Sequence, residues 1–123
     1  MKRSLGRSGI EVSALGMGCW AIGGPFYNGE GQPIGWGEVD DNESIHAIHA
    51  ALDHGVTFFD TADVYGAGHS EEVLGKAVSN RRSKLVIATK FGNRFDPDTK
   101  KILGTDSTPA YLRQAVEASL RRL

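Results

Sequence analysis

Short apolar runs alternate with amphipathic segments along most of the chain. Residues 14–20, 56–60 and 85–90 are mostly apolar runs of strand length, which is typical of buried strands. Three other segments carry apolar residues at helical spacing: residues 40–54, 70–78 and 108–123. Because parallel strands need a crossover and a helix is the usual one, the alternation predicts an α/β fold with a parallel sheet, either doubly wound or closed into a barrel.

The helix boundaries carry capping signals. Asp40 is placed to cap the first helix, with Glu43 three residues later, and Gly55 follows its end. Thr108 as N-cap and Pro109 at the first helical position predict the start of the last helix.

The remaining segments are predicted as a hairpin and two loops. Residues 3–13 alternate loosely around two glycines, which indicates a short β-hairpin. Residues 21–39 are rich in glycine and aromatic residues, and we expect a long loop that covers a pocket. Residues 91–107 are expected to form another polar loop.

Composition limits the classes of function. A chain of 123 residues with a net charge of −1 predicts one core and no electrostatic attraction to nucleic acid or to an anionic membrane. Cys19 is the single cysteine, which excludes an internal disulfide and a cysteine-based zinc site. No apolar stretch has the length of a membrane span or the place of an export signal, so we expect a cytoplasmic protein.

Two weaker signals favour structural roles. Residues 16–21 match the dinucleotide fingerprint G-x-G-x-x-A, but the glycines and proline at 23–25 oppose the helix that this fingerprint needs. We therefore expect Gly16 and Gly18 to allow close approach of a ligand or neighbour. His46 and His49 lie three residues apart on a helix, where we expect solvated flank residues and no metal.

Three polar residues are expected at one edge of the sheet. Asp60 closes an apolar strand, Tyr65 follows in the turn, and Lys90 closes the next strand. The carboxyl ends of parallel strands are where ligands bind in such folds. Two interpretations fit: a ligand site, or a buried Asp60–Lys90 ion pair beside a loop aromatic.

The chain also resembles a known family. The motifs FDTA (59–62), YG (65–66), SEEVLG (70–75), VIATKFG (86–92) and LGMGCW (15–20) are similar, in combination, to those of the aldo-keto reductases. The resemblance covers essentially all of residues 1–123. It implies a (β/α)8 TIM barrel, of which this single partial domain supplies the N-terminal hairpin and roughly the first three βα units, and it implies reduction of aldehydes or ketones to alcohols with NAD(P)H.

The resemblance also implies roles for individual residues. The family's catalytic aspartate, tyrosine and lysine correspond to Asp60, Tyr65 and Lys90, while its histidine belongs after the last helix, beyond Leu123. Four residues are expected near the nicotinamide: Gly18, Cys19, Trp20 and Asp60. NADP(H) is expected ahead of NAD(H). Four aromatic residues of the loop and its strand are expected either to frame an apolar carbonyl substrate or to pack and hold the loop down: Trp20, Phe26, Tyr27 and Trp36.

The chemistry explains why these residue types occur together. Hydride addition to a carbonyl carbon leaves charge on the oxygen, and a phenol aimed at that oxygen can donate a proton. A neighbouring ammonium stabilises the phenolate, and a carboxylate keeps that ammonium charged. On this interpretation Glu71 and Glu72 only start a helix, and Asp63 is a turn residue.

Other classes of function stay open. The aldo-keto reductase fold also serves as a non-catalytic accessory subunit, and a doubly wound nucleotide-binding domain is a third possibility. The final helix reaches Leu123 at an apolar position without a capping residue. We therefore expect an incomplete barrel, whose partners are a carbonyl substrate, a nicotinamide cofactor and the missing C-terminal part.

Overall fold

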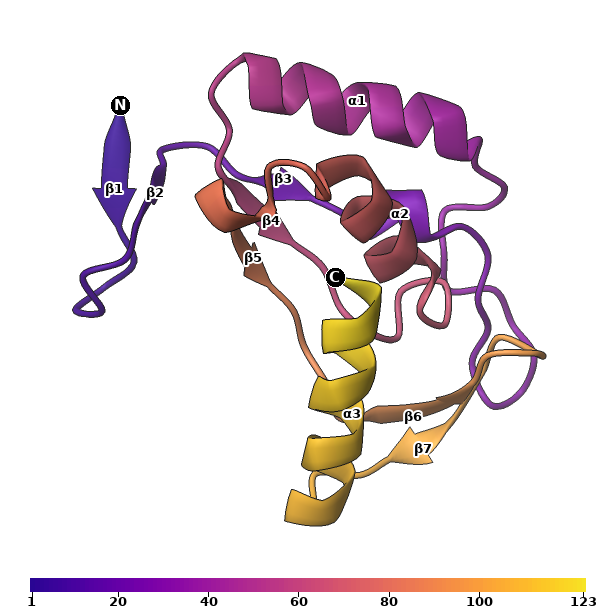
Figure 1. The fold of residues 1–123 in the computed structure, drawn as a ribbon. Helices are drawn as coiled ribbons and strands as arrows, with labels where there is room; N and C mark the ends of the chain where they lie inside the picture. Colours follow the sequence, from indigo (N-terminus) through magenta and orange to yellow (C-terminus); the bar gives the residue numbers. More distant parts are fainter.

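A parallel sheet of three strands lies at the centre of the computed structural model, which describes residues 1–123 (Figure 1). The order is β3 (Met17–Gly18), β4 (Phe58–Asp60) and β5 (Val86–Ala88), and each strand is shorter than predicted. The register sets Gly18 beside Asp60 and Asp60 beside Ala88. All three strands therefore end at the same edge.

Three α-helices pack around this sheet, as the hydrophobic spacing predicts. They are α1 (Asp41–Asp53), α2 (His69–Val78) and α3 (Pro109–Arg122). The Asp40 carboxylate accepts from the first-turn amides of α1, and the Thr108 hydroxyl accepts from the Tyr111 amide, so both predicted caps are confirmed. Helices α1 and α2 lie side by side, and α2 also contacts α3 (Figure 1).

Two short 3-10 helices interrupt the connections, η1 (Ala21–Gly23) and η2 (Arg82–Lys84). Between β3 and α1 the single 3-10 turn η1 is the only helical element, and it ends at Gly24, whose φ is +71°. Residues 16–21 therefore do not lead into the helix N-terminus that would meet a pyrophosphate. The doubly wound interpretation loses its main support.

The predicted N-terminal hairpin is confirmed as β1 (Lys2–Ser4) paired antiparallel with β2 (Glu11–Ser13). Two reciprocal bonds tie it to the sheet: the Ser13 amide donates to Thr57 Oγ1 and the Thr57 amide donates to Ser13 Oγ, each at 2.9 Å. The hairpin is thus attached just before β4.

The predicted loop over residues 91–107 is wrong, because most of it forms a second hairpin. Strands β6 (Asn93–Asp96) and β7 (Lys101–Thr105) pair antiparallel. Their turn is held by the Asp96 carboxylate, which accepts from the Asp98 amide at 2.9 Å and from Thr99 Oγ1 at 2.8 Å. Charged and polar residues interrupt the apolar alternation of these strands, so the apolar pattern does not predict them.

This second hairpin anchors the long loop over residues 21–39. The Tyr27 amide donates to the Lys100 carbonyl at 2.9 Å, and the Ile102 amide donates to the Tyr27 carbonyl at 2.8 Å. Phe26, the residue before Tyr27, is 3% exposed and packs in a small cluster with Ala62 and Val64. The loop is therefore a docked segment whose aromatic residues have fixed places.

The main core lies between the sheet and the helices α1 and α2. Its largest fully buried side chains are those of Phe59, Ile48 and Leu74. Complete burial of a side chain of this size contributes roughly 1.5–3 kcal/mol, so this cluster is the main apolar contribution to stability.

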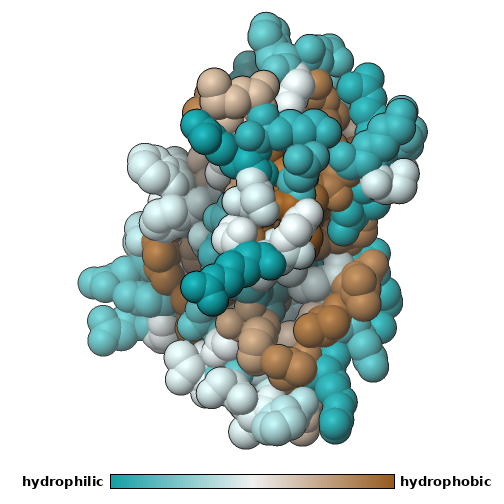
Figure 2. Space-filling model, turned by 90° about the vertical axis from the view of Figure 1, so that its left-hand side faces the viewer, coloured by the Kyte–Doolittle hydropathy of each residue, from teal (hydrophilic) through white to brown (hydrophobic).

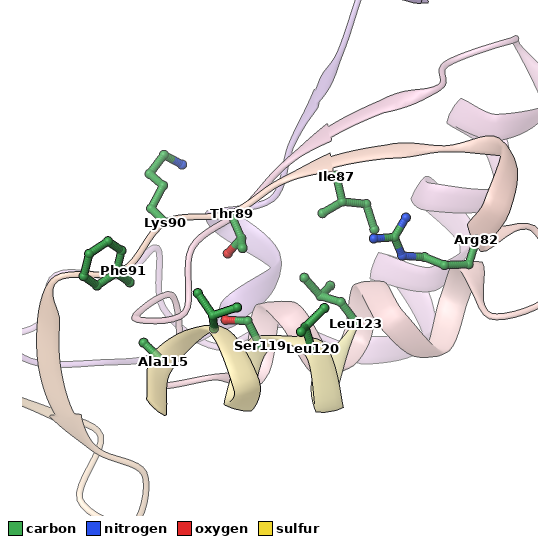
Figure 3. A pocket seen from close by; sticks show the side chains of 10 residues that line it. Arg82, Ile87, Thr89, Lys90, Phe91, Ala115, Ser119, Leu120 and Leu123 are labelled. Carbon is green, nitrogen blue, oxygen red and sulfur yellow. The ribbon is translucent and has the colours of Figure 1, made fainter. Parts of the chain in front are cut away.

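A groove between β5 and α3 exposes apolar surface. It encloses about 470 Å³, and Figure 3 shows Ile87 of β5 facing Leu120 and Leu123 of the α3 end across it. Val116 and Leu120 on the same helix are 45% and 71% exposed. Figure 2 shows hydrophobic residues at the surface in separate groups among hydrophilic ones. The groove differs from other exposed apolar surface because it lies next to an open sheet edge: β5 has a strand partner on one side only.

A buried ion pair joins α2 to α3. Glu71 lies in the first turn of α2 as expected, but it is fully buried and accepts from Arg122 Nε and from Thr89 Oγ1, each at 2.6 Å. A Cβ atom on Gly75 would overlap the Arg122 carbonyl, so a glycine is needed for the close approach of the two helices. Glu71 is therefore more than a helix-start residue.

Asp63 lies in the predicted turn, but its side chain is buried. The residue is 2% exposed. Burial, and then the nearby Glu71 carboxylate, raise the pKa of Asp63 from 3.8 to about 6, although Arg122 and a backbone hydrogen bond from Val64 act against this rise. Ionisation of Asp63 at neutral pH therefore opposes folding.

The exposed groove predicts self-association of the 123-residue chain. Unpaired strand edges and apolar patches promote association, so sedimentation velocity should show oligomers that grow with concentration. Leu120→Glu places a charge in the groove and should shift the distribution towards monomer. Leu15→Glu is the matched control, because Leu15 is 78% exposed outside the groove. A monomer at all concentrations would contradict this prediction.

Asp63 should make the chain less stable as pH rises. Its pKa is raised in the folded state, so the folded chain binds more protons than the unfolded chain between pH 3.8 and about 6. The free energy of unfolding should fall by about 3 kcal/mol across this window and stay reduced above it. In Asp63→Asn this fall should be absent, whereas Asp98→Asn in the exposed β6–β7 turn should keep it. Urea unfolding followed by tryptophan fluorescence at several pH values measures the effect, and parallel pH profiles for Asp63→Asn and the unsubstituted chain would refute it.

Candidate functional site

The three polar residues predicted at the sheet edge lie together. Asp60 is the last residue of β4, Tyr65 lies in the turn that follows, and Lys90 comes two residues after β5. Lys90 Nζ donates to Asp60 Oδ2 at 2.9 Å and to the Thr61 carbonyl at 2.7 Å. The same nitrogen lies 5.1 Å from the centre of the Tyr65 ring. An ammonium, a carboxylate and a phenol thus share one small volume.

The expectation of a buried ion pair is wrong in one respect, because the Asp60 and Lys90 side chains are 46% and 50% exposed. Partial burial acts to lower the pKa of Lys90, but the hydrogen bond and charge of Asp60 outweigh it with help from Tyr65, so the pKa of this ammonium is raised overall. Lys90 is therefore positively charged at neutral pH.

Tyr65 is held by its turn and by aromatic packing. Gly66 has a φ of +62°, and a Cβ atom there would overlap the Gly23 carbonyl of η1, so the turn requires glycine after Tyr65. The Tyr65 ring stacks on Trp20, with centroids 5.8 Å apart and an interplanar angle of 17°. Phe26 contacts the same ring at 6.5 Å between centroids. These contacts fix the direction of the phenol.

A hollow of about 360 Å³ opens beside these groups. Its lining contains one carboxylate, one phenol and mostly apolar groups: Gly18, Cys19, Trp20, Ala21, Trp36, Asp60 and Tyr65. Trp36 meets Trp20 edge to face, with centroids 5.6 Å apart. Of the four aromatic residues expected around a substrate, Trp20 and Trp36 line the hollow, whereas Phe26 and Tyr27 do not.

Two hydroxyl groups that pattern reasoning missed hold the base of the site. Ser70 Oγ donates to the Cys19 carbonyl at 2.6 Å and lies 2.9 Å from Thr61 Oγ1. Both hydroxyl residues are fully buried, and the pair links β3, the end of β4 and α2. Both lie within the motifs FDTA and SEEVLG, which is the signal that marks them.

Cys19 lies in the hollow's wall with a buried thiol. Burial and then the charge of Asp60 raise the pKa of Cys19 to about 12, although Lys90 acts in the opposite direction. The thiol is therefore protonated at neutral pH, which opposes a role as a nucleophile.

His49 and His69 make structural contacts outside the hollow. His49 Nε2 lies 2.9 Å from the Ala77 carbonyl, and His69 Nε2 lies 2.8 Å from Asp41 Oδ1. No three side chains of histidine, cysteine, aspartate or glutamate are placed to hold a metal ion. None of the α-helices has the length and apolarity needed to cross a bilayer.

Comparison with known sequences identifies relatives over almost the whole chain. The model of the aldo/keto reductase family matches residues 14–123. An uncharacterised oxidoreductase of Bacillus subtilis, YqkF, is 35% identical over 99% of the chain, and the aldo-keto reductase YhdN of the same organism is 39% identical over 98%. The chain spans 35% and 33% of these two proteins, or about a third of their length.

Solved structures agree with this assignment. The holo form of the aldo-keto reductase AKR11C1 from Bacillus halodurans superposes with a TM-score of 0.81 at 35% identity, covering 99% of this chain and 36% of that one. The glycerol dehydrogenase AKR11B4 from Gluconobacter oxydans gives 0.75 at 42% identity, covering 99% and 35%. An aldo-keto reductase from Klebsiella pneumoniae in complex with NADPH gives 0.62 at 28%, covering 91% and 31%. The chain therefore belongs to the aldo/keto reductase family and corresponds to the N-terminal portion of its TIM barrel.

Proposed function

We propose that the protein containing this chain reduces aldehydes or ketones to alcohols with hydride from NAD(P)H, and that Tyr65 is its general acid. The observation that carries the proposal is the convergence of Tyr65, Lys90 and Asp60 beside the hollow at the carboxyl edge of the sheet. Membership of a family of oxidoreductases supports the class of reaction.

The residues around the hollow fit a nicotinamide ring. A Cβ atom on Gly18 would meet no atom within 4 Å, so this stretch of β3 leaves free space beside the hollow. Trp20 and Asp60 offer a flat apolar surface and a hydrogen-bond acceptor, and the buried Cys19 also lines the hollow. When bound, the reduced nicotinamide supplies a hydride to the carbonyl carbon. The NADPH complex of the Klebsiella relative supports NADP(H) ahead of NAD(H).

Proton donation is the task of the chain's own residues. As hydride reaches the carbonyl carbon, negative charge grows on the substrate oxygen, and the Tyr65 hydroxyl donates its proton to that oxygen. The Lys90 ammonium, 5.1 Å from the centre of the ring, stabilises the phenolate that remains. Asp60 holds Lys90 in its charged form and fixes its position through the 2.9 Å bond.

The lining of the hollow supports an apolar carbonyl substrate. Trp20 and Trp36 stand edge to face and present aromatic surface beside Tyr65. A substrate with an apolar or aromatic group next to its carbonyl would gain contact area there and leave its oxygen towards the phenol. The family's catalytic histidine is expected from the remainder of the barrel. The complete set of Asp60, Tyr65 and Lys90 favours catalysis over a purely accessory role.

Tyr65→Phe should remove the proton donor and little else. In a polypeptide that contains residues 1–123 and completes the barrel, kcat for an aromatic aldehyde should fall by a factor of about 10² to 10⁴, while NADPH affinity is unchanged. Phenylalanine keeps the stack on Trp20 and the contact with Phe26. Steady-state NADPH oxidation and fluorescence titration measure the two quantities. Tyr27→Phe is the control, because Tyr27 lies outside the hollow, and full activity of Tyr65→Phe would refute the assignment.

Lys90→Met should lower turnover without a large loss of stability. Removal of the ammonium leaves the Tyr65 phenolate without its nearest positive charge, so kcat should fall strongly. The ion pair with Asp60 is about half exposed, so its loss should cost no more than about 1 kcal/mol in the free energy of unfolding. Asp60→Asn should reduce kcat less, because the donor and the ammonium both remain. Kinetics and thermal unfolding on both variants test this order, and a greater loss of kcat in Asp60→Asn would contradict it.

A further inference from the structure

We propose that Glu71 and Arg122 are positioning residues for Lys90, acting through the hydroxyl of Thr89. The inference rests on the proposed role of Lys90 and extends the site to a buried ion pair on its far side. The three residues come from different elements: Glu71 from α2, Arg122 from the end of α3 and Thr89 from the segment after β5.

The two residues at the end of β5 point in opposite directions. In Figure 3 the Thr89 hydroxyl points towards α3, whereas the Lys90 side chain extends to the other side of the chain. This alternation is that of extended backbone, in which successive side chains face opposite ways. A contact that fixes the Thr89 side chain therefore also fixes the direction in which the Lys90 side chain leaves the backbone.

Apart from the two bonds that Lys90 Nζ makes to Asp60 and to the Thr61 carbonyl, few contacts hold this segment. β5 ends at Ala88, and the next backbone bond runs from the Asp63 amide to the Lys90 carbonyl at 3.2 Å. Thr89 contributes a further side-chain anchor on the opposite side of the backbone, because its Oγ1 donates to Glu71 Oε1 at 2.6 Å. Hydrogen bonds to a charged acceptor are stronger than those between neutral groups. Residues 89–90 are thus attached to the Glu71 carboxylate through the Thr89 hydroxyl.

Arg122 holds that carboxylate in place. Its Nε donates to Glu71 Oε2 at 2.6 Å, so each carboxylate oxygen has its own donor. The Glu71 side chain is completely buried and that of Arg122 is 20% exposed. A buried charge is tolerated when it is paired and hydrogen-bonded, and loss of one partner is costly. The neighbours Glu72 and Arg121 are exposed and provide matched controls.

Competitive amine labelling tests the positioning directly in a polypeptide that contains residues 1–123 and completes the barrel. Acetic anhydride should modify Lys90 more slowly than the exposed Lys76, because the ammonium is held by Asp60 and the Thr61 carbonyl. Thr89→Val deletes the anchor and leaves the ion pair, so the rate at Lys90 should rise by about tenfold, the usual worth of a hydrogen bond to a charged group. Glu71→Gln and Arg122→Gln should act in the same direction.

The control variants either keep the Thr89 hydroxyl or change only exposed neighbours of the ion pair. Thr89→Ser, Glu72→Gln and Arg121→Gln should leave the labelling ratio of Lys90 to Lys76 unchanged. The inference is overturned if Thr89→Val leaves the ratio unchanged, or if Lys90 already reacts as fast as Lys76 in the unsubstituted chain. Thr89→Val decides the matter even if Glu71→Gln fails to fold, because it keeps the shape of the residue and the ion pair.

Kinetics in the completed barrel separate this inference from the proposed function. Thr89→Val should lower kcat by about tenfold and displace the pH profile of kcat, with KM for NADPH unchanged and with recovery in Thr89→Ser. If Tyr65→Phe is inactive while Thr89→Val has the normal kcat and pH profile, positioning through Thr89 is wrong. If Tyr65→Phe is fully active, the proposed function is wrong, and the labelling result still reports on the anchor.

Discussion

The parallel register of β3, β4 and β5 is the constraint on which the rest of the structure depends. It sets Gly18, Asp60 and Ala88 in one row, so the segments that leave these strands emerge at one edge. The ladder continues beyond the regular strands, since the Cys19 amide donates to the Asp60 carbonyl and the Thr61 amide donates to the Ala88 carbonyl, each at 2.8 Å. Asp60 and Lys90 meet because of this backbone alignment, and their attraction then sets only the final side-chain geometry.

The ion pairs Asp60–Lys90 and Glu71–Arg122 differ in burial and therefore in what they contribute. Asp60–Lys90 is about half exposed beside the hollow, where water screens the attraction and its contribution to stability is small. Glu71–Arg122 is largely buried between α2 and α3, where a broken pair would leave an uncompensated charge. The exposed pair is suited to contact with a ligand, and the buried pair is suited to fixing the distance between elements.

The sequence predicts the regular elements well, because the helices depend on apolar spacing and on local caps such as Asp40 and Thr108. The hairpin of β6 and β7 could not be predicted from apolar spacing, since it depends on the Asp96 turn and on pairing with Tyr27 far away in the sequence. The closeness of Asp60 and Lys90 follows from the parallel sheet, whereas the burial of Glu71 does not. A glutamate in the first turn of a helix is explained by the helix dipole alone, and only the approach of α3 reveals its second role.

The open groove and the candidate site lie on opposite sides of the same segment, which follows β5. Thr89, Lys90 and Phe91 line the groove with α3, while Lys90 also reaches Asp60 and Tyr65 on the other side. Any segment that packs against the free edge of β5 therefore changes the solvent exposure of Lys90. Water now screens this ammonium, and its exclusion would strengthen the interaction of Lys90 with both the carboxylate and the phenol. Covering the apolar surface of β5 and α3 is thus physically coupled to the electrostatics on which proton donation by Tyr65 would depend.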